Sequence, residues 1–397
     1  MFIKRPKEIL PEGIKQAISM EVPVFILIFF GFFVLLGSKM GAANMFNTMM
    51  NTAHDLLINT VFYIMAIAVL AGAVSALWSE FGVIFLLNKL LSPLIQPLYG
   101  LPGASAVGIF TTYLSDNPAI LTLAEDNNFR RFFKKYQLPA LCNIGTSFGM
   151  GLIITTFMIG LRSPIGEGFG IAVLIGNLGA IIGSIVSTRL MLHQTAKIYG
   201  KEADCDVHGN TGPLIDIDHY RQVRRGGAGT RFIDALLEGG KSGVDMGLSI
   251  IPGVLIICTM VMMLTNGMPE GGYTGAAYEG IGLLPWLGSK IQFILMPLFG
   301  FSSAESIAVP ITALGAAGAA IGIVENLIRT GAANAHDVAV FTAMCMCWSG
   351  YLSTHVAMMD SLKCHELTGK AIVSHTIGGL CAGVAANWIF KLVMLIL

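Results

Sequence analysis

A four-residue pattern occurs twice in this chain, once in each half of the sequence. Pro-Leu-Tyr-Gly at 97–100 returns as Pro-Leu-Phe-Gly at 297–300, 200 positions later, and the match continues with Ala104 and Ala304. Each copy lies in a hydrophobic stretch that glycine and proline interrupt. Two weakly similar halves with interrupted hydrophobic segments are the best sequence indication of a secondary transporter whose site lies between the halves.

A second match extends this internal repeat. Cys-Asn-Ile-Gly at 142–145 corresponds to Cys-Trp-Ser-Gly at 347–350, at an offset of 205. We therefore divide the chain into an N-terminal segment with one added helix, a first repeat, a linker and a second repeat, at 1–55, 56–192, 193–243 and 244–397.

The amino-acid composition indicates a membrane protein. Of the 397 residues, 54% are hydrophobic and only 12% are charged, whereas soluble domains carry about 25% charged residues. The net charge is zero, which argues against nucleic acid as a partner. We expect an all-α chain that crosses the cell membrane several times, because helices satisfy their own backbone hydrogen bonds in lipid.

Seven stretches are long and apolar enough to cross a bilayer, which takes about 20 residues. They are Val22–Leu36, Leu56–Trp78, Leu138–Leu161, Phe169–Leu192, Val244–Leu264, Val338–Met359 and Ala371–Leu397. Two further regions, Phe81–Asp126 and Ile281–Glu325, are about twice that length and are punctuated by proline and glycine. We predict that each forms a surface segment followed by a re-entrant helical hairpin, with its non-helical backbone buried in protein or lining a wet cavity.

The distribution of lysine and arginine orients these segments. Lys4 and Arg5 place the N-terminus in the cytoplasm, and the basic residues within 130–135 and 193–243 fall on the same side when the hairpins add no net crossing. The C-terminus is then outside. The first repeat begins outside and the second begins inside, so we predict that the two repeats are inverted.

The first polar cluster at membrane depth lies just after Pro139. Asn143, Thr146 and Ser147 lie around Gly145 and ahead of Gly149, in a pattern that predicts a helix that unwinds inside the membrane. Free carbonyls with amide and hydroxyl oxygens form the hard ligand set that suits Na⁺ or a polar solute. The alternative is helix packing through small residues. We predict that these three residues bind the coupling cation and that Asn143 also contacts the substrate.

The second cluster lies at the start of the second hairpin. Glu305 is costly at membrane depth unless it meets a cation, a donor-rich substrate or a proton. We predict a substrate site at Glu305 with Ser302, Ser303 and Ser306. The alternative is a protonated or paired glutamate that stabilises the hairpin tip.

The first hairpin offers fewer polar groups. Ser105 stands where the second hairpin has Glu305, and Asp116 and Asn117 follow in the second arm. We include Ser105, Asp116 and Asn117 among the substrate-binding candidates, although Asp116 is equally suited to cap a helix that restarts at Pro118.

The third cluster is the second repeat's counterpart of the first. Ser349, Ser353 and His355 are candidate substrate contacts, and Trp348 and Tyr351 are suited to stack on a planar ring. The alternative for His355 is a hydrogen-bonded packing residue.

A run of sulfur ligands supports a different reading. Cys345, Met346 and Cys347 are soft ligands that suit Cu(I), and with His355 downstream also Fe(II). Alternating residues on a helix point to different faces, and methionine is a common filler of apolar gaps. Transition-metal transport is therefore the alternative function, with these three residues as its ligands.

Four of these motifs together resemble the nucleoside-recognition (Gate) domain superfamily. They are the two Pro-Leu-aromatic-Gly patterns, Ser-Ala-Glu at 303–305, and the run at 142–147. The superfamily includes concentrative nucleoside transporters, the membrane part of ferrous-iron transporters and spore-maturation-type membrane proteins. The resemblance implies that Glu305 is the hairpin carboxylate and that Asn143 and Thr146 form the unwound-helix site for sodium. The chain departs from that pattern at 100–105, where Ser105 is the only polar side chain.

The sequence contains no P-loop, no H-E-x-x-H motif and no nucleophile elbow, so we do not expect an enzyme. We expect a Na⁺- or H⁺-coupled secondary transporter of a small polar solute, nucleoside-like as the leading class, working by alternating access. A non-transporting scaffold of the spore-maturation type is the second alternative. No resident cofactor is expected other than Na⁺, and the sequence leaves a homo-oligomer open.

Overall fold

The computed structural model describes residues 17–115, 119–120, 130, 132–164, 166, 168–205, 223–349 and 351–396, without the side chains of 352–354, 357 and 361. Asp116, Asn117 and the side chain of Ser353 therefore lie outside the described part of the chain.

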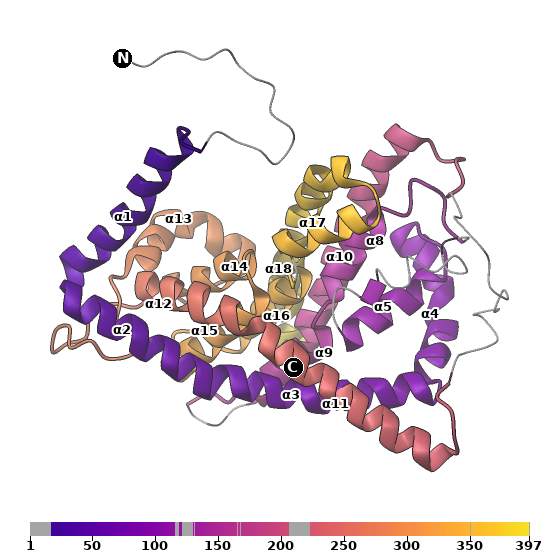
Figure 1. The fold of residues 1–397 in the computed structure, drawn as a ribbon, viewed down its shortest axis with the longest axis horizontal. Coiled ribbons are helices and arrows are strands. Elements are labelled where there is room, and N and C mark those ends of the chain that lie inside the picture. The colour runs from indigo at the N-terminus through magenta and orange to yellow at the C-terminus, as the bar shows by residue number, and fades with distance from the viewer. Residues whose placement is uncertain are drawn as a thin grey trace.

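Within these ranges the chain forms helices and loops, with two isolated backbone bridges. The helices are α1 (Glu21–Met40), α2 (Ala42–Asp55), η1 (Leu56–Val61), α3 (Phe62–Glu80), α4 (Val83–Tyr99), α5 (Ser105–Leu114), α8 (Ala140–Phe148), α9 (Gly151–Gly160), α10 (Gly170–Tyr199), α11 (Ala228–Pro252), η2 (Gly253–Cys258), α12 (Thr259–Thr265), α13 (Leu283–Phe299), η3 (Ala304–Ile307), α14 (Ala308–Ala313), α15 (Ala317–Arg329), α16 (Ala335–Cys347), α17 (Tyr351–Ser361), η4 (His365–Leu367) and α18 (Thr368–Ile396). In Figure 1, α12–α15 lie on one side of the central helices and α4 and α5 on the other.

The chain is an all-α polytopic membrane protein. Six described helical segments are long and apolar enough to cross a bilayer, and they coincide with six of the seven predicted crossings. The predicted crossing Val338–Met359 is divided between α16 and α17. Because α2, η1 and α3 run as one helix over Ala42–Glu80, the second crossing begins earlier than the apolar pattern predicts.

Two long helices, α10 and α18, cross in close contact at the centre of the molecule. A Cβ added to Gly183 would lie 2.5 Å from the carbonyl oxygen of Gly378, and one added to Gly378 would lie 2.7 Å from that of Gly183. Gly179 approaches the Ala382 carbonyl in the same way, at 2.7 Å. Small residues let the two backbones touch, which is the usual way to gain van der Waals contact between helices in lipid.

A second crossing joins α3 and α11, which run together along the lower edge of Figure 1. A Cβ on Gly72 would lie 2.4 Å from the Gly239 carbonyl, and one on Gly243 would lie 2.4 Å from the Ala68 carbonyl. Each of these long helices contains one π-helical turn, η1 or η2. The two π-helical turns lie 197 positions apart in the sequence and pack against each other.

The repeated Pro-Leu-aromatic-Gly pattern ends a helix in both halves. Helices α4 and α13 stop at Gly100 (φ +76°) and Gly300 (φ +67°), where the left-handed backbone requires glycine. The carbonyls left open at these helix ends are bonded by a side chain of the last long helix of each half. Arg189 Nε donates to the Leu98 carbonyl at 2.9 Å. Asn387 Nδ2 donates to the Leu298 carbonyl at 2.8 Å.

The aromatic residue of the pattern differs together with its partner. The Tyr99 hydroxyl bonds the Ser184 hydroxyl at 2.8 Å. In the second half Phe299 takes the place of the tyrosine and packs at Gly383, so both hydroxyls are absent. A buried hydroxyl without a partner is costly, so a tyrosine at position 299 would need a hydrogen-bond partner of its own.

The second sequence match, at an offset of 205, differs by five residues from the offset that relates the two helix breaks. The first broken helix is interrupted at Gly149 and Met150, and α9 begins at Gly151. The second resumes with α17 at Tyr351, which gives an offset of 200 instead of 205. The same offset relates two hydrogen bonds ahead of these helices: the Lys134 N–H donates to the Gln137 side chain, and the Asn334 N–H donates to the Asp337 side chain, both at 2.9 Å. The match of Cys142 with Cys347 was therefore the wrong alignment.

In the second hairpin region, α14 and α15 pack side by side. Helix α13 is followed by η3 and α14 at a bend of 78°, and three residues then lead into α15. Of the first hairpin region, α4 and α5 are described, and its second arm falls largely outside the described residues. The re-entrant path of both regions stays a prediction.

The predicted linker has narrower limits in the structure. Helix α10 continues to Tyr199 and α11 starts at Ala228, so both ends of the segment 193–243 are helical. The last part of the linker is fastened to α3, because Arg224 Nη1 lies 2.7 Å from a carboxylate oxygen of buried Glu80.

The close crossing of α10 and α18 generates a stability prediction. Gly183→Ala should lower the free energy of unfolding by about 1–3 kcal/mol, because its Cβ meets backbone that cannot move aside. Gly369→Ala in the same pair of helices meets nothing within 4 Å and should be neutral or slightly stabilising. Thermal unfolding of both variants in detergent measures the difference, and equal melting temperatures would contradict this account of the crossing.

Candidate functional site

The two broken helices meet at their breaks. The Ser349 hydroxyl, just before α17, donates to the carbonyl of Thr146 in α8 at 2.9 Å. The sulfur of Cys347, at the end of α16, lies 3.9 Å from the hydroxyl oxygen of Ser147. Residues from both predicted repeats therefore share one buried polar site, which we call the central network.

Asn143 connects the central network to the long helices. Its Nδ2 donates to Ser187 of α10 at 2.8 Å and to the carbonyl of Ala371 in α18 at 3.1 Å. Its Oδ1 is fully buried and has no hydrogen-bond partner among the described residues. A buried acceptor without a donor is costly, so this oxygen is a candidate ligand for a cation or for a donor group of a solute.

Thr146 and Ser147 lie within α8 instead of in an unwound segment. The Thr146 hydroxyl donates to the Cys142 carbonyl and the Ser147 hydroxyl to the Asn143 carbonyl, both at 2.8 Å. The helix ends at Phe148, and Met150 takes φ +57°. The predicted unwinding of this segment therefore occurs after the cluster, because the hydroxyls support helical turns there.

Two fully buried histidines complete the central network. Nδ1 of His355 bonds the carbonyl of Tyr351, which can only accept, so this nitrogen carries the proton and Nε2 is the acceptor. The nearest hydroxyl to that Nε2, on Thr146, is 3.5 Å away and already donates to a carbonyl. His375 bonds the Cys347 carbonyl and Ser187, and the two rings are 4.6 Å apart. Sequence reasoning missed His375, although an imidazole inside the apolar stretch 371–397 was a signal.

The serines of the second hairpin bind a carboxylate that sequence reasoning also missed. Asp337 is fully buried and accepts the Ser302 N–H at 2.9 Å, the Ser302 hydroxyl at 2.5 Å and the Asn334 N–H at 2.9 Å. Ser306 reaches the same carboxylate at 3.4 Å, while Ser303 lies 3.4 Å from Ser306. A capping box at the start of α16 was the available signal.

Glu305 lies apart from the central network in the described contacts. It lines a cavity of about 670 Å³ with Tyr278, Asn326 and Arg329. Ser105, its counterpart in the first hairpin, is fully buried with no hydrogen-bond partner among the described residues. Among the predicted substrate residues that are described, Asn143, Ser349 and His355 belong to the central network and Glu305 lines its own cavity. The serines of the second hairpin gather around Asp337 in a cluster that we call the Asp337 anchor, and Ser105 belongs to none of these groups.

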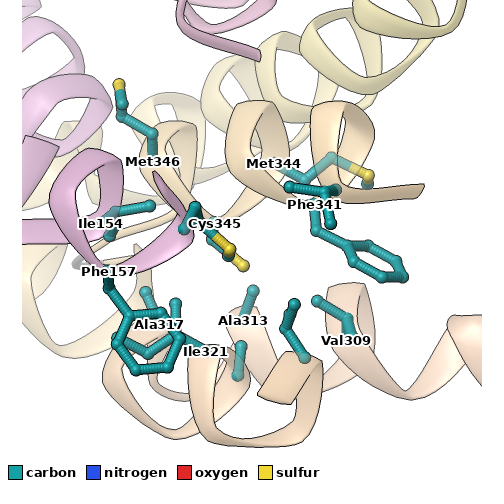
Figure 2. Packing of buried hydrophobic residues seen from close by; sticks show 14 of the residues in the cluster. Ile154, Phe157, Val309, Ala313, Ala317, Ile321, Phe341, Met344, Cys345 and Met346 are labelled. Carbon is teal, nitrogen blue, oxygen red and sulfur yellow. The ribbon is translucent and has the colours of Figure 1, made fainter. Parts of the chain in front are cut away.

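The sulfur residues of the metal alternative point in different directions. Figure 2 shows Cys345 directed at the apolar side chains of α14 and α15, and Met346 directed away from them. Cys347 faces Ser147. Among the residues that the structure describes, no group of three or more His, Cys, Asp or Glu is placed to hold a metal ion.

Two cavities border different parts of the long helix Ala42–Glu80. One, of about 490 Å³, lies between α3, α5 and α11, and Ser79, Thr111 and Asp245 are among its lining residues. The other, of about 310 Å³, lies between η1, the loop 266–282 and α15. On the shared helix, the lining residues of the two cavities that lie nearest each other are Thr60 and Ala68, about 12 Å apart at 1.5 Å per residue.

Comparisons with known proteins give a structural likeness only. No protein-family model matches the chain, and no curated protein matches it. A solved structure of a CNTnw variant in an outward-facing state, a concentrative nucleoside transporter, is similar with a TM-score of 0.53 at 15% identity, covering 96% of this chain and 93% of that one. A second CNTnw variant in an outward-facing state has a TM-score of 0.48 at 15% identity and covers 94% of this chain and 85% of that one. At this identity the likeness establishes the fold.

The Asp337 anchor generates the second prediction. Asp337→Ala should lower the free energy of unfolding by about 1–2 kcal/mol, because it removes a fully buried carboxylate that accepts hydrogen bonds from the N–H groups of Ser302 and Asn334 and caps α16. Asp360→Ala is the control, since that carboxylate is exposed and pairs with His365 on the surface, where an ion pair contributes about 1 kcal/mol at most. Equal unfolding midpoints for the two variants in a denaturant titration would refute the anchor.

Proposed function

We propose that this chain is a secondary active transporter that moves a small polar solute by alternating access. A nucleoside-like molecule is the leading substrate class, and Na⁺ or H⁺ is the coupling ion. The observation that carries the proposal is the meeting of two broken helices at a buried polar network that residues from both predicted repeats share.

The breaks provide the polarity that a solute path needs. A helix end leaves backbone carbonyls without intrahelical partners, and here two helix ends meet in an otherwise apolar core. Non-helical backbone at membrane depth is tolerated where protein or a wet cavity surrounds it. Broken helices whose ends meet between two repeats are the arrangement in which secondary transporters bind substrate and coupling ions.

The central network offers acceptors rather than donors. Asn143 Oδ1 has no partner among the described residues, and His355 Nε2 has only a distant one. Acceptors of this kind fit either a hard cation or the hydroxyl and amino groups of a polar solute. This supports cation coupling through Asn143, with Thr146 and Ser147 as its neighbours on α8.

The fold likeness to concentrative nucleoside transporters supports the transporter class. The resemblance of Glu305 and its neighbours to a hairpin carboxylate supports a hydroxyl-bearing substrate. The first hairpin has only Ser105 at the matching place, so the nucleoside class depends on the second hairpin.

The first test of this proposal is a ligand panel. Nucleosides, nucleobases, amino acids, Fe²⁺ and Cu⁺ are added to the purified protein with and without Na⁺, and the melting temperature is measured. A ligand at 100 times its Kd stabilises the native state by about 2.7 kcal/mol. We expect a Na⁺-dependent shift with one organic class. A shift with metal alone would support the metal transporter, and no shift with any ligand would favour the scaffold.

A substitution tests the hairpin carboxylate. Glu305→Gln should abolish uptake into proteoliposomes while leaving the melting temperature without ligand unchanged, because the Glu305 carboxylate lines a cavity and no described side chain is bonded to it. Glu270→Gln, an exposed residue in the loop 266–282, is the matched control and should transport normally. Unchanged uptake by Glu305→Gln would remove this residue from the site.

A further inference from the structure

The cavity of about 310 Å³ between η1, the loop 266–282 and α15 is built from charged and polar side chains. We call it the η1–α15 cavity, and its lining residues are Asp55, Asn59, Thr60, Tyr278, Gly322, Glu325, Asn326 and Arg329. It shares Tyr278, Asn326 and Arg329 with the cavity of Glu305, so the two spaces have a common wall.

Two features of the backbone create this space. The π-helical turn η1 brings Asn59 and Thr60 to the cavity, and such turns often occur at functional sites. Gly322 lets α15, the opposite wall of the cavity, lie close to η1, because a Cβ at this position would lie 3.0 Å from the Thr60 methyl carbon. The cavity therefore depends on local geometry in both helices.

The two carboxylates of the cavity differ in how many hydrogen bonds they accept. Asp55 accepts hydrogen bonds from the Tyr278 hydroxyl and from Asn59 Nδ2. Glu325 accepts one long hydrogen bond, from Thr60 at 3.4 Å. Glu325 thus retains most of its acceptor capacity inside the cavity.

The donors of the cavity are also incompletely used. Arg329 lies four residues after Glu325 on α15, at the spacing that favours an ion pair, but no ion pair between them is formed within 4.0 Å. Its guanidinium instead donates to Asn326 Oδ1 at 2.9 Å and stacks 5.6 Å from the Tyr278 ring. Asn326 is only 8% exposed, and no described residue accepts a hydrogen bond from its Nδ2.

The carboxylates and donors of the η1–α15 cavity together favour one class of ligand. Two carboxylates against one guanidinium disfavour an anion, whereas an unused acceptor opposite unused donors suits a solute with both kinds of group. The volume lies at the lower end of the range of about 300–1,000 Å³ that small-molecule sites occupy. Nucleosides, with hydroxyl donors and ring acceptors, and amino acids, with an ammonium and a carboxylate group, share this chemistry.

We propose that the η1–α15 cavity is a second solute site, which captures a small neutral or zwitterionic molecule beside the Glu305 cavity. Glu325 accepts hydrogen bonds from the donors of the solute, and Arg329 with Asn326 donates to its acceptors. The identity of the captured solute rests on the proposed transport function, while the site itself rests on the cavity.

Equilibrium binding to the full chain in lipid nanodiscs tests the site, with radiolabelled uridine, adenosine and serine as probes. We expect one of them to bind, and Glu325→Gln and Arg329→Gln each to weaken its Kd about tenfold, as for the loss of one charge-assisted hydrogen bond. The control Glu270→Gln should stay within about twofold of the unsubstituted chain. Size-exclusion profiles and melting temperatures without ligand show whether each variant is folded.

Uptake in proteoliposomes from the same preparations separates the two proposals. Binding that both variants weaken, without uptake by the unsubstituted chain, supports the site and refutes transport of that solute. If the unsubstituted chain takes up the solute and both folded variants bind it with unaltered Kd, the second site is refuted and the transport proposal stands. Failure of all three probes to bind also overturns the second site.

Discussion

The close contact of α10 with α18 is the constraint on which the centre of the molecule depends. Gly183 and Gly378 bring the two backbones together, and the neighbouring turns of these helices carry Ser187 and His375. Both side chains can reach the ends of the broken helices only because no side chain separates α10 from α18. The central network is thus a consequence of glycine packing in a medium where backbone polarity must be satisfied within the protein.

The two halves keep the same backbone plan and change its chemistry. Arg189 and Asn387 both bond the carbonyls of the Pro-Leu-aromatic-Gly pattern, whereas the Tyr99 hydroxyl bonds Ser184 and the Phe299 ring lies beside Gly383. Each half thus satisfies its own buried groups at this helix end. The halves also differ where a ligand would bind, since Glu305 has Ser105 as its counterpart.

The position of the candidate residues separates anchoring from recognition. Ser302 and Ser306 are occupied by Asp337, which fastens the second hairpin to α16. Glu305, Glu325 and Arg329 instead line cavities and keep unused hydrogen-bonding capacity. A solute that moves from the η1–α15 cavity past Glu305 would meet carboxylate acceptors at each step.

The sequence by itself determined the all-α membrane class and most of the crossings, because apolar length is a local property of the chain, and the division into two inverted repeats stays a prediction. It also identified Asn143 and Glu305 as unusual, because a polar group is costly at membrane depth. Only the tertiary structure decided which polar groups meet. The five-residue error in the Cys142 match, the roles of His375 and Asp337, and the cavity between η1 and α15 all depend on contacts between segments far apart in the chain. Periodicity and composition do not contain these distances, which follow from how the helices cross.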